Sequence, residues 1–442
     1  MTKGFTRRQA TRLLLAGAGA GLAMPYITKA YGQGGKELVF WHSYSQPERI
    51  ASMEGFAARF KEKTGVGVRM EVVPWSDMAT KWTTAAAGGT LPNVLIAGAP
   101  IAIAMWEAGV ARPLDGLISA MGPDYFVSND ILKGFNTYEG ATVCLPHYSH
   151  CRLVIYRKDV FEEAGIAKPP ETWEEFEEAA RLATKAPDRY GMLQFWGGPS
   201  TGATLPLHLL ADSNGGALIN EKFDANINSP EVVEAIKQLY RFYEVGSAPG
   251  EVSIPFSGQA YDLFNAGKSA MMVDTLFTAT SFAKAQPELF GKGALGFIAP
   301  PRRKQIGRLS DVISFVATKG PLEAETDEWM RFLIEGEEYV DFLHTIPGGM
   351  FPVTKAAAAN PRFMAHPFLD SIKEGVQVVL DRMPVGIGVG ATYGSNPSAS
   401  LVAGKGLIET MMQNMALNKV DAQTAADAAN AELQSQIDRL RR

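Results

Sequence analysis

The sequence predicts an α/β protein with at least two lobes and a parallel, doubly wound sheet. Two observations support this fold class. A chain of 442 residues exceeds what one hydrophobic core usually supports. Three strand–helix units also follow one another between residues 37 and 108, and each begins with a short apolar run.

The first unit joins a strand to a helix through a polar turn. Residues 38–41 form a continuous apolar run, which is typical of a strand buried on both faces. Pro47 suits the first turn of a helix, and apolar residues recur at helical spacing from Ile50 to Phe60. Open α/β sheets bind small ligands at the carboxyl ends of their strands, beside helix amino termini. Residues 42–46 are therefore predicted to form one wall of a binding site.

The later segments continue this pattern. Thr172 and Glu175 have the spacing of a capping box, which predicts a helix start. Ser229 followed by Pro230 predicts another helix start. The other expected elements are strands over 66–73, 92–100, 190–196 and 269–273, and helices over 78–87, 101–108, 205–210 and 416–433.

The first 32 residues have the character of an export signal. Basic residues that include Arg7 and Arg8 precede a run of Leu, Ala and Gly over residues 13–23, and small residues follow at Ala30 and Gly32. The run is too short and too rich in glycine for a membrane span. The paired arginines resemble a twin-arginine signal, but Ala10 stands where that signal usually has Phe or Leu. Ordinary secretion therefore stays open.

The net charge bears on the possible partners. The whole chain carries a formal charge of −5, and loss of the signal removes five basic residues and no acid, which leaves −10. An acidic chain without a basic stripe indicates neither a nucleic-acid partner nor an anionic membrane.

Cys144 and Cys151 are the two cysteines of the chain. An oxidising compartment permits a disulfide between them. Residues 141–156 are predicted to be extended, however, and an extended chain would hold the two sulfurs beyond bridging range. A disulfide needs a sharp turn at Pro146, so the sequence leaves both states open.

Several motifs occur in an order that is similar to one known family. They are residues 58–68 (ARFKEKTGVGV), 85–99 (AAAGGTLPNVLIAGA), 144–166, 169–180 (PPETWEEFEEAA), 264–274 (FNAGKSAMMVD) and 347–353 (PGGMFPV). Together they cover nearly the whole mature chain. They resemble the extracellular solute-binding proteins of carbohydrate ABC importers.

The resemblance implies a periplasmic-binding-protein fold, in which two doubly wound α/β lobes are joined by a three-crossing hinge around a ligand cleft. The first lobe is expected to hold residues 36–147 and 313–346, and the second lobe residues 148–309 and 350–442. The crossings are expected near 147–151, 309–312 and 346–350, where Gly348-Gly349 supplies permissive backbone.

The resemblance also implies a function. The chain is expected to be a periplasmic monomer that captures a sugar, oligosaccharide or glycoside and delivers it to an ABC permease, without catalysis, cofactor or metal. An alternative is a binder of a polyol phosphate or of a sulfonated or otherwise anionic sugar derivative. The histidines near the expected cleft, His42, His147 and His150, favour such an acid-substituted ligand.

The expected ligand contacts follow from the chemistry of sugars. Aromatic rings stack on the apolar faces of sugars, while Asp, Asn, Gln and His side chains bind the hydroxyl groups. The candidates stand in predicted turns after strands, at the predicted crossings and in the glycine-rich segment 386–397. They are His42, Ser43, Tyr44, Gln46, Trp75, Asp77, Gly98, His147, His150, Trp196, Gly198, Ser200, Thr201, Phe277, Asp311, Gly349, Tyr393 and Asn396.

Two other interpretations compete for some of these residues. Gly198–Gly202 reads G-x-S-x-G, which is the pattern of a serine hydrolase with Ser200 as nucleophile, but Pro199 does not suit the strained turn that this pattern requires. Cys144, His147, His150 and Cys151 are zinc-ligand types. In an extended segment their side chains alternate between two faces, so a metal site is not expected.

Overall fold

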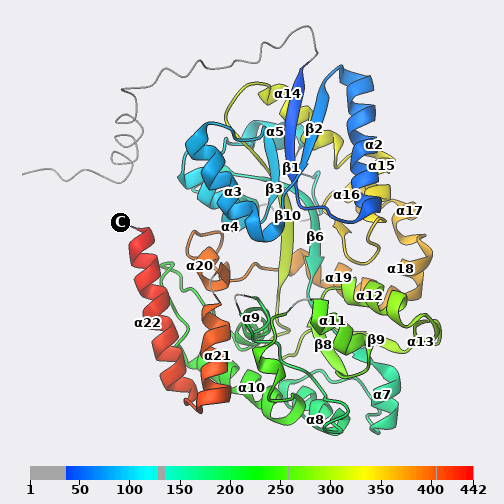
Figure 1. Cartoon of the computed structure of the whole chain (residues 1–442), viewed down its shortest axis with the longest axis vertical. Coiled ribbons are helices and arrows are strands. Elements are labelled where there is room, and N and C mark those ends of the chain that lie inside the picture. Colours follow the sequence, from blue (N-terminus) through cyan, green and yellow to red (C-terminus); the bar gives the residue numbers. More distant parts are fainter. Residues whose placement is uncertain are drawn as a thin grey trace, which may run out of the picture.

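The computed structural model describes residues 36–122, 124–127, 135–198, 200–256, 258–404 and 406–441. The expected export signal lies outside these residues. Figure 1 shows two stacked bodies. We call the body around the six-stranded sheet the first lobe, and the body around the three-stranded sheet the second lobe.

The first lobe is built on a mixed sheet with strand order β11-β6-β10-β3-β1-β2. Strand β1 (Glu37–His42) lies parallel to β2 (Gly67–Val72) and to β3 (Val94–Ala97), as the three strand–helix units predicted. Beyond β3 the pairing is antiparallel, through β10 (Ser310–Ala317), β6 (Leu145–Cys151) and β11 (Phe351–Pro352). The helices of this lobe are α2 (Pro47–Thr64), α3 (Trp75–Gly88), α4 (Ala99–Glu107), α5 (Asp115–Met121), α14 (Glu323–Phe332), α15 (Gly336–Leu343), α16 (Lys355–Ala358) and α17 (Pro361–Met364).

Local sequence explains the first unit. Phe40 in β1 is fully buried, as are Met53 and Phe60 on the inner face of α2. Helix α2 begins with Pro47 and ends at Thr64, and it is capped by Gly65, whose φ of 75° is the left-handed conformation that glycine adopts without a steric penalty. The predicted strand, proline start and amphipathic helix are all confirmed.

The second lobe has a smaller sheet with strand order β8-β7-β9. Its central strand β7 (Leu153–Arg157) is antiparallel to both β8 (Met271–Asp274) and β9 (Leu295–Ile298). The capping box of Thr172 and Glu175 is present at the start of its helix. The helices grouped around this sheet include α7 (Lys158–Glu163), α8 (Trp173–Ala183), α9 (Thr204–Ser213), α10 (Pro230–Gly246), α11 (Gly258–Asn265), α12 (Phe277–Ala285), α13 (Pro287–Gly291), α18 (Pro367–Ser371) and α19 (Lys373–Arg382).

The strand predicted over residues 190–196 is wrong. The segment makes single bridges at Tyr190 and Trp196 but has no continuous ladder. Its backbone instead lies in close contact with the backbone of other segments. A Cβ atom added at Gly191 would lie 1.9 Å from the carbonyl oxygen of Ala180, and one added at Gly197 would lie 2.1 Å from the carbonyl oxygen of Ser253. The run is apolar because it crosses the buried interior of the lobe, and two glycines permit the close approach.

The two sheets are connected directly. Strand β6 ends at Cys151 and β7 begins at Leu153, so Arg152 alone separates a strand of the large sheet from a strand of the small sheet. The chain returns to the large sheet at the start of β10, and the backbone N–H of Arg152 donates to the carbonyl of Leu309 at 3.1 Å. These two connections therefore lie side by side.

The third connection differs from the expected one at 346–350. Phe351 and Pro352 still pair with β6 in the large sheet. The ring centres of Phe363 and Phe351 are 5.9 Å apart, so Phe363 packs on the first lobe. Phe368 instead stacks on Phe290 of the second lobe, with ring centres 5.4 Å apart. The chain changes lobes between residues 363 and 368, because the turn at Gly348-Gly349 returns it to the edge of the large sheet.

The C-terminal helices cover the second lobe. The alanine-rich segment forms α22 (Ala422–Leu440), which begins later than predicted, at the capping residue Asp421. It packs with α21 (Leu407–Asn418) and buries Ala426, Ala429 and Leu433. The remaining elements are α20 (Ala399–Gly404), the two short strands β4 (Thr137–Tyr138) and β5 (Ala141–Thr142), and the 3-10 helices η2 (Glu251–Ser253) and η3 (Met383–Val385). Within the described ranges, no helix combines the length and the apolar character that a bilayer crossing requires.

Candidate ligand-binding site between the two lobes

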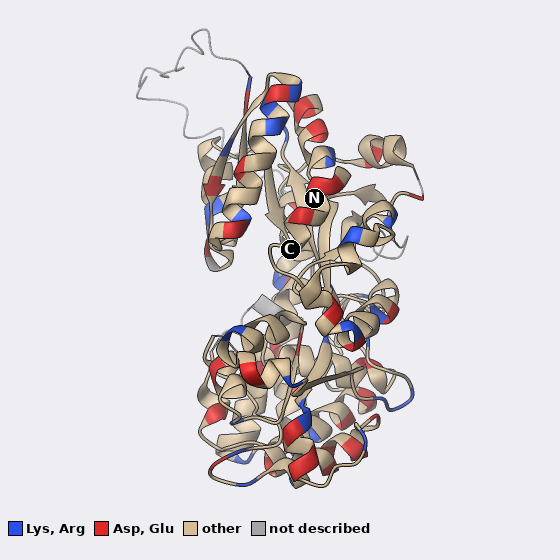
Figure 2. Cartoon of the chain, turned by 90° about the vertical axis from the view of Figure 1, so that its right-hand side faces the viewer, with Lys and Arg blue, Asp and Glu red and all other residues tan. Residues whose placement is uncertain are grey.

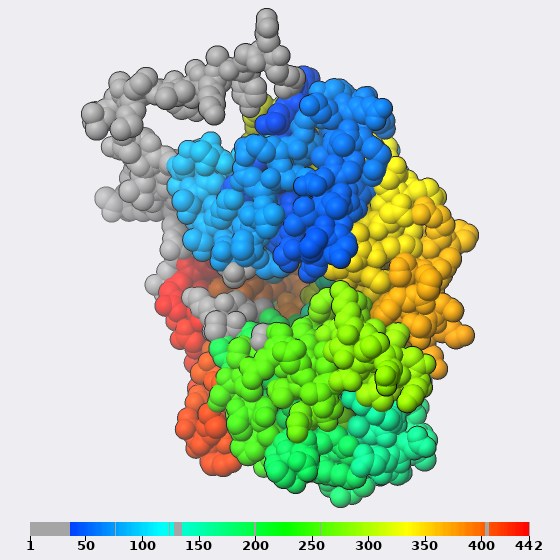
Figure 3. Space-filling model, turned by 45° about the vertical axis from the view of Figure 1, so that its right-hand side comes forward, coloured from blue at the N-terminus to red at the C-terminus, as the bar shows by residue number. Residues whose placement is uncertain are grey.

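A cavity lies between the two lobes and is lined from both. It encloses about 760 Å³ of empty space, including its open mouth. In Figure 3 the blue residues of the first lobe and the green residues of the second lobe face each other across a furrow. The lining residues are Gln46, Arg49, Trp75, Tyr148, His150, Arg152, Phe256, Tyr261, Asp274, Thr275, Phe277, Ile313, Ile346, Gly349 and Met350.

Aromatic rings stand on both sides of this cavity. The first lobe contributes Trp75, at the start of α3 and 44% exposed, and Tyr148 from β6. The second lobe contributes a chain of edge-to-face contacts, from Phe256 to Tyr261 at 6.0 Å and from Tyr261 to Phe277 at 5.4 Å. Such rings offer flat apolar surfaces on which the CH faces of a sugar or polyol can stack.

An arginine with two carboxylates forms the polar floor. Arg152 pairs with Asp274 at the end of β8 and, at 3.2 Å, with Asp311 in β10. Burial lowers the pKa of Arg152, but the charges of the two carboxylates outweigh it and the pKa is raised overall. The side chain of Asp311 stays 36% exposed, so its free oxygen can accept from a ligand hydroxyl.

The first lobe contributes a second arginine in a different environment. The guanidinium of Arg49 donates to the hydroxyl of Tyr148 at 3.1 Å and to the Oε1 of Gln46 at 3.4 Å. It also lies 3.2 Å from the sulfur of Met350 and 4.3 Å from the ring centre of Tyr44. All of these partners are neutral.

His150 completes the polar lining. Its Nδ1 lies 2.8 Å from the carbonyl oxygen of Gly349, so this nitrogen carries the proton and Nε2 is the ring atom left for a ligand. Burial lowers the pKa of His150, and the positive charges of Arg152 and Arg49 act in the same direction against the charge of Asp311. The neutral ring can accept from a hydroxyl group.

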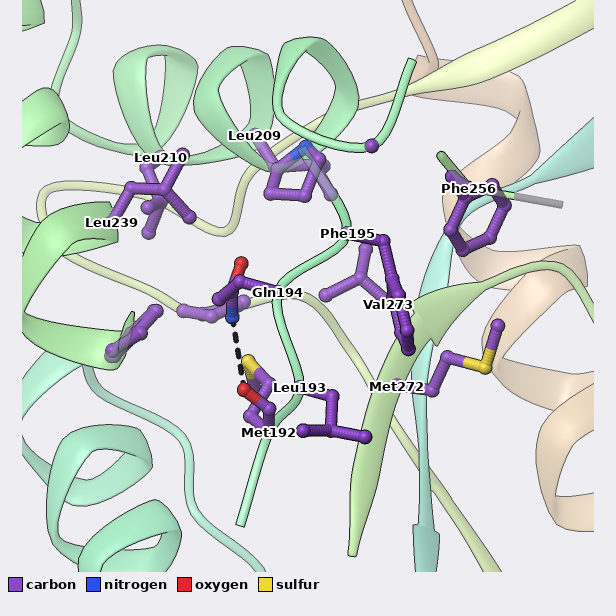
Figure 4. A pocket seen from close by; sticks show the side chains of 14 residues that line it. Met192, Leu193, Gln194, Phe195, Leu209, Leu210, Leu239, Phe256, Met272 and Val273 are labelled. Atoms are coloured by element: carbon purple, nitrogen blue, oxygen red, sulfur yellow. Dashed lines mark hydrogen bonds between the residues drawn. The ribbon is translucent and has the colours of Figure 1, made fainter. Parts of the chain in front are cut away.

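A second cavity lies inside the second lobe, between residues 192–195 and helices α9 and α10 (Figure 4). Its lining is apolar apart from Gln194, whose Nε2 donates to the carbonyl of Met192 at 3.3 Å. It offers few partners for hydroxyl groups. The cavity between the lobes is therefore the candidate site.

Comparison with known proteins identifies the family of the chain. The model of the bacterial extracellular solute-binding protein family matches residues 44–335. The chain belongs to this family. This solute-binding protein is 28% identical over 302 residues to a putative binding protein of Brucella abortus (strain 2308), a match that covers 67% of this chain and 71% of the relative.

Two further matches extend over most of the chain. A putative ABC transporter periplasmic-binding protein of Escherichia coli (strain K12) is 23% identical over 90% of this chain and 92% of its own length. The crystal structure of a sugar transporter from Arthrobacter chlorophenolicus with bound laminaribiose superimposes with a TM-score of 0.74 at 19% identity, over 90% of this chain and 99% of the other. At that identity the likeness shows the fold.

The solute-binding protein brings together only some of the residues expected from its sequence. Gln46, Trp75, His150, Phe277 and Gly349 line the cavity between the lobes. Asp311 is not itself in the lining, but it pairs with Arg152, which is. Their contact with a ligand remains a prediction.

Five of the expected residues are buried elsewhere. His42 stacks on Tyr44 at 4.9 Å, and the Tyr44 hydroxyl lies 3.0 Å from Nδ1 of His147. These three side chains belong to the core of the first lobe, where burial lowers the pKa of His42 to about 4 and that of His147 well below its usual value. Trp196 is fully buried beside Tyr243 in the second lobe, and Asn396 binds the backbone of its own loop. None of the five lines the cavity.

Other candidates lie outside the cavity as well. Asp77 borders an open groove on α3 with Arg69 and Lys81, and Gly98 precedes the first turn of α4. Tyr393 is 48% exposed in the glycine-rich loop. Ser43, Gly198 and Thr201 are also outside the lining set, although the Ser43 hydroxyl is buried and has no partner within the described part of the chain.

Ser200 lacks the surroundings of a nucleophile. Its hydroxyl donates to the carbonyl of Gly197 at 3.0 Å and accepts from the backbone N–H of Phe256 at 3.4 Å. A histidine base, which a serine hydrolase needs, is not among its partners in the described residues. Pro199 lies outside those residues.

The cysteine–histidine segment also has no common centre. Cys144 and Cys151 are both buried free thiols, and burial raises the pKa of Cys144 to about 12. His147 points into an aromatic cluster with Phe315, whereas His150 points to the cavity. No group of three or more metal-ligating side chains gathers within the described ranges.

The residues that sequence reasoning missed include the most polar part of the cavity. Arg49, Tyr148, Arg152, Tyr261 and Asp274 line it and were not among the expected contacts. A signal for Arg49 was available. It precedes Met53 by four positions and Phe56 by seven, so it stands on the apolar stripe of α2. A charged residue on such a stripe indicates a specific role.

Proposed function

We propose that this chain captures a small carbohydrate or polyol in the periplasm and delivers it to the membrane permease of an ABC importer. The observation that carries this proposal is the cavity lined from both lobes, with aromatic rings on two sides and hydrogen-bonding groups between them. Stacking and hydroxyl contacts together are what recognition of a polyhydroxylated solute requires. The sugar-bound relative of the same fold supports the same ligand class.

The mechanism needs no bond chemistry. A ligand that touches Trp75 in the first lobe and Phe277 in the second gains its full binding energy only when both lobes approach it. Such a ligand favours the closed arrangement by its differential affinity for the two states. The closed, loaded monomer is then the form that the permease recognises.

A thermal-shift screen over mono- and disaccharides, sugar alcohols and their derivatives tests the proposal. A ligand at a hundredfold excess over its dissociation constant stabilises the folded state by about 2.7 kcal/mol. For the best ligand, small-angle scattering should show a smaller radius of gyration. Stabilisation by none of the compounds, or chemical turnover of one of them, contradicts the proposal.

A further inference from the structure

Among the residues that the structure describes, no carboxylate pairs with the guanidinium of Arg49. Its side chain is 8% exposed, and its hydrogen-bond partners are a tyrosine hydroxyl, a glutamine oxygen and a methionine sulfur. Its Nε is buried without a partner in the part of the chain that the structure describes. A buried guanidinium that keeps its charge without an anion is costly, because it gives up the solvation of water.

The other buried arginines each pair with a carboxylate. Arg112 is 7% exposed and pairs with Asp327, and Arg157 is 5% exposed and pairs with Asp159 at 2.6 Å. Many exposed cations are paired as well, such as Lys237 with Glu234, and Figure 2 shows basic and acidic residues mixed over both lobes. Among the described arginines that are buried to this degree, Arg49 differs in having no carboxylate.

Aromatic contacts hold Arg49 in place but do not neutralise it. Its guanidinium carbon lies 4.3 Å from the ring centre of Tyr44, and 5.6 Å from those of Tyr148 and Phe342. These rings restrict the guanidinium to one orientation. Gln46, Tyr148 and Met350, which receive its N–H groups, all line the cavity between the lobes. The charge is thus fixed at the wall where a ligand binds.

The groups around Arg49 add no negative charge to this wall. His150 lies on the same side, with its ring centre 5.5 Å from that of Tyr148. Arg49 contributes to the lowered pKa values of His42, His147 and His150, so its charge acts on each of these rings. The carboxylates of Asp274 and Asp311 are engaged by Arg152. One guanidinium with two carboxylates leaves that cluster a net charge of −1, so the acid group of a ligand is directed towards Arg49 and its hydroxyl donors towards the cluster.

We propose that the ligand of this cavity is an acidic sugar or polyol whose carboxylate, sulfate or phosphate binds the guanidinium of Arg49. The inference rests on the proposed function and narrows its ligand class. The planar fork of a guanidinium binds such groups through two parallel N–H donors. The hydroxyl groups of the same ligand would reach His150 and the Arg152 cluster, and its CH face would stack on the aromatic rings.

Matched pairs of compounds test this inference by thermal shift and calorimetry. Each pair shares one polyhydroxylated body and differs in charge: glucose with glucuronate and glucose 6-phosphate, galactose with galacturonate, and mannitol with mannonate. We expect at least one acid to bind tenfold or more tightly than its neutral partner, and its affinity to fall with added salt. If a neutral member binds equally well or better in every pair that binds, the inference is wrong and the proposed function stands. If no compound binds, the proposed function is wrong, and the inference falls with it.

Three variants identify the residue responsible. Arg49→Met should reduce the affinity for the acid at least tenfold, and Arg49→Lys should reduce it less, because lysine keeps the charge but not the fork. Arg59→Gln is the control: Arg59 lies on the same helix and against Phe56, but its side chain is 44% exposed and outside the cavity. It should leave binding unchanged. Equal loss in Arg59→Gln and Arg49→Met would overturn the assignment.

The ligand-free protein supplies a second measurement. If Arg49 serves a ligand, its replacement by methionine removes an unmatched buried charge, and the Tm of ligand-free Arg49→Met should equal or exceed that of the parent. A structural role predicts the opposite. A fall in Tm of about 8 °C or more, which for a chain of this size reflects more than about 2 kcal/mol, would overturn the inference even if binding were also lost.

Discussion

The guanidinium of Arg152 pairs with the carboxylate of Asp274, which is 1% exposed at the end of β8. Arg152 is also the single residue between a strand of the large sheet and a strand of the small one. The pair thus stands where the two lobes are covalently joined, and it forms the floor of the cavity. Asp274 is further fixed by Thr278, whose hydroxyl donates to it at 2.6 Å.

Arg152→Met should destabilise the protein strongly. The substitution leaves Asp274 buried without its cation, and breaking a buried pair in this way costs about 3–5 kcal/mol. Urea unfolding monitored by tryptophan fluorescence measures the loss. The matched control is Arg69→Met, because Arg69 pairs with Glu71 on the surface, where a lost pair costs less than about 1 kcal/mol. Similar losses in the two variants would show that the pair with Asp274 contributes little.

Phe277→Ala should weaken ligand binding without unfolding the second lobe. Phe277 is only partly buried and lines the cavity, with one side of its ring on Tyr261. Loss of a stacking ring is expected to cost at least about 1 kcal/mol of binding energy, a five- to tenfold weaker affinity by calorimetry. Tyr393→Ala, in a loop that does not line the cavity, serves as the control. Unchanged affinity in Phe277→Ala would remove the stacking argument.

Trp196→Ala should lower the stability of the protein and leave its ligand affinity unchanged. The sequence predicted Trp196 as a stacking residue, but its ring is fully buried beside Tyr243 in the core of the second lobe. Removing a buried tryptophan leaves a large cavity and costs about 3–5 kcal/mol of stability. The variant should lose Tm while the folded fraction binds ligand with the parent affinity. A variant of normal Tm with impaired binding would return Trp196 to the site.

The contrast between Phe277 and Trp196 shows what the sequence can and cannot decide. Periodicity, proline starts and glycine stops located the elements of the first lobe, because these signals act within one turn or one strand. Both aromatics follow apolar runs, so both satisfy the same local pattern. Whether a ring faces a cavity or a core depends on residues that are distant in sequence, such as Tyr261 beside Phe277 and Tyr243 beside Trp196.

Arg49 also shows that the sequence does not reveal the partners of a side chain. Its position on the apolar stripe of α2 could be read from the sequence, but the lack of a carboxylate partner among the described residues could not. Its surroundings come from three segments, since Tyr148 belongs to β6, Phe342 to α15 and Met350 to the turn before β11. An ion pair, or the lack of one, is a property of the assembled fold.

Acidification should destabilise the protein already between pH 6.5 and pH 5, and His42 should be one cause. Burial, followed by the charge of Arg49, lowers the pKa of His42 from 6.5 to about 4. A base with a lowered folded-state pKa contributes stability above its unfolded pKa and loses it as the pH falls from 6.5 towards 4. One such histidine accounts for about 1.5 kcal/mol between pH 6.5 and pH 5. Urea unfolding at half-unit steps of pH measures the slope.

His42→Asn separates this residue from the other titrating groups. The asparagine oxygen can still accept from the backbone N–H of Tyr44, which donates to Nδ1 of His42 at 3.2 Å. Carboxylates with lowered pKa values, such as Glu163 at about 2, lose their contribution only below about pH 4.5, outside the measured interval. The variant should therefore lose about 1.5 kcal/mol less than the parent between pH 6.5 and pH 5. Parallel curves would mean that the pKa of His42 is the same in the folded and unfolded states, and the buried stack of His42 on Tyr44 would then have to be more open than its 1% exposure indicates.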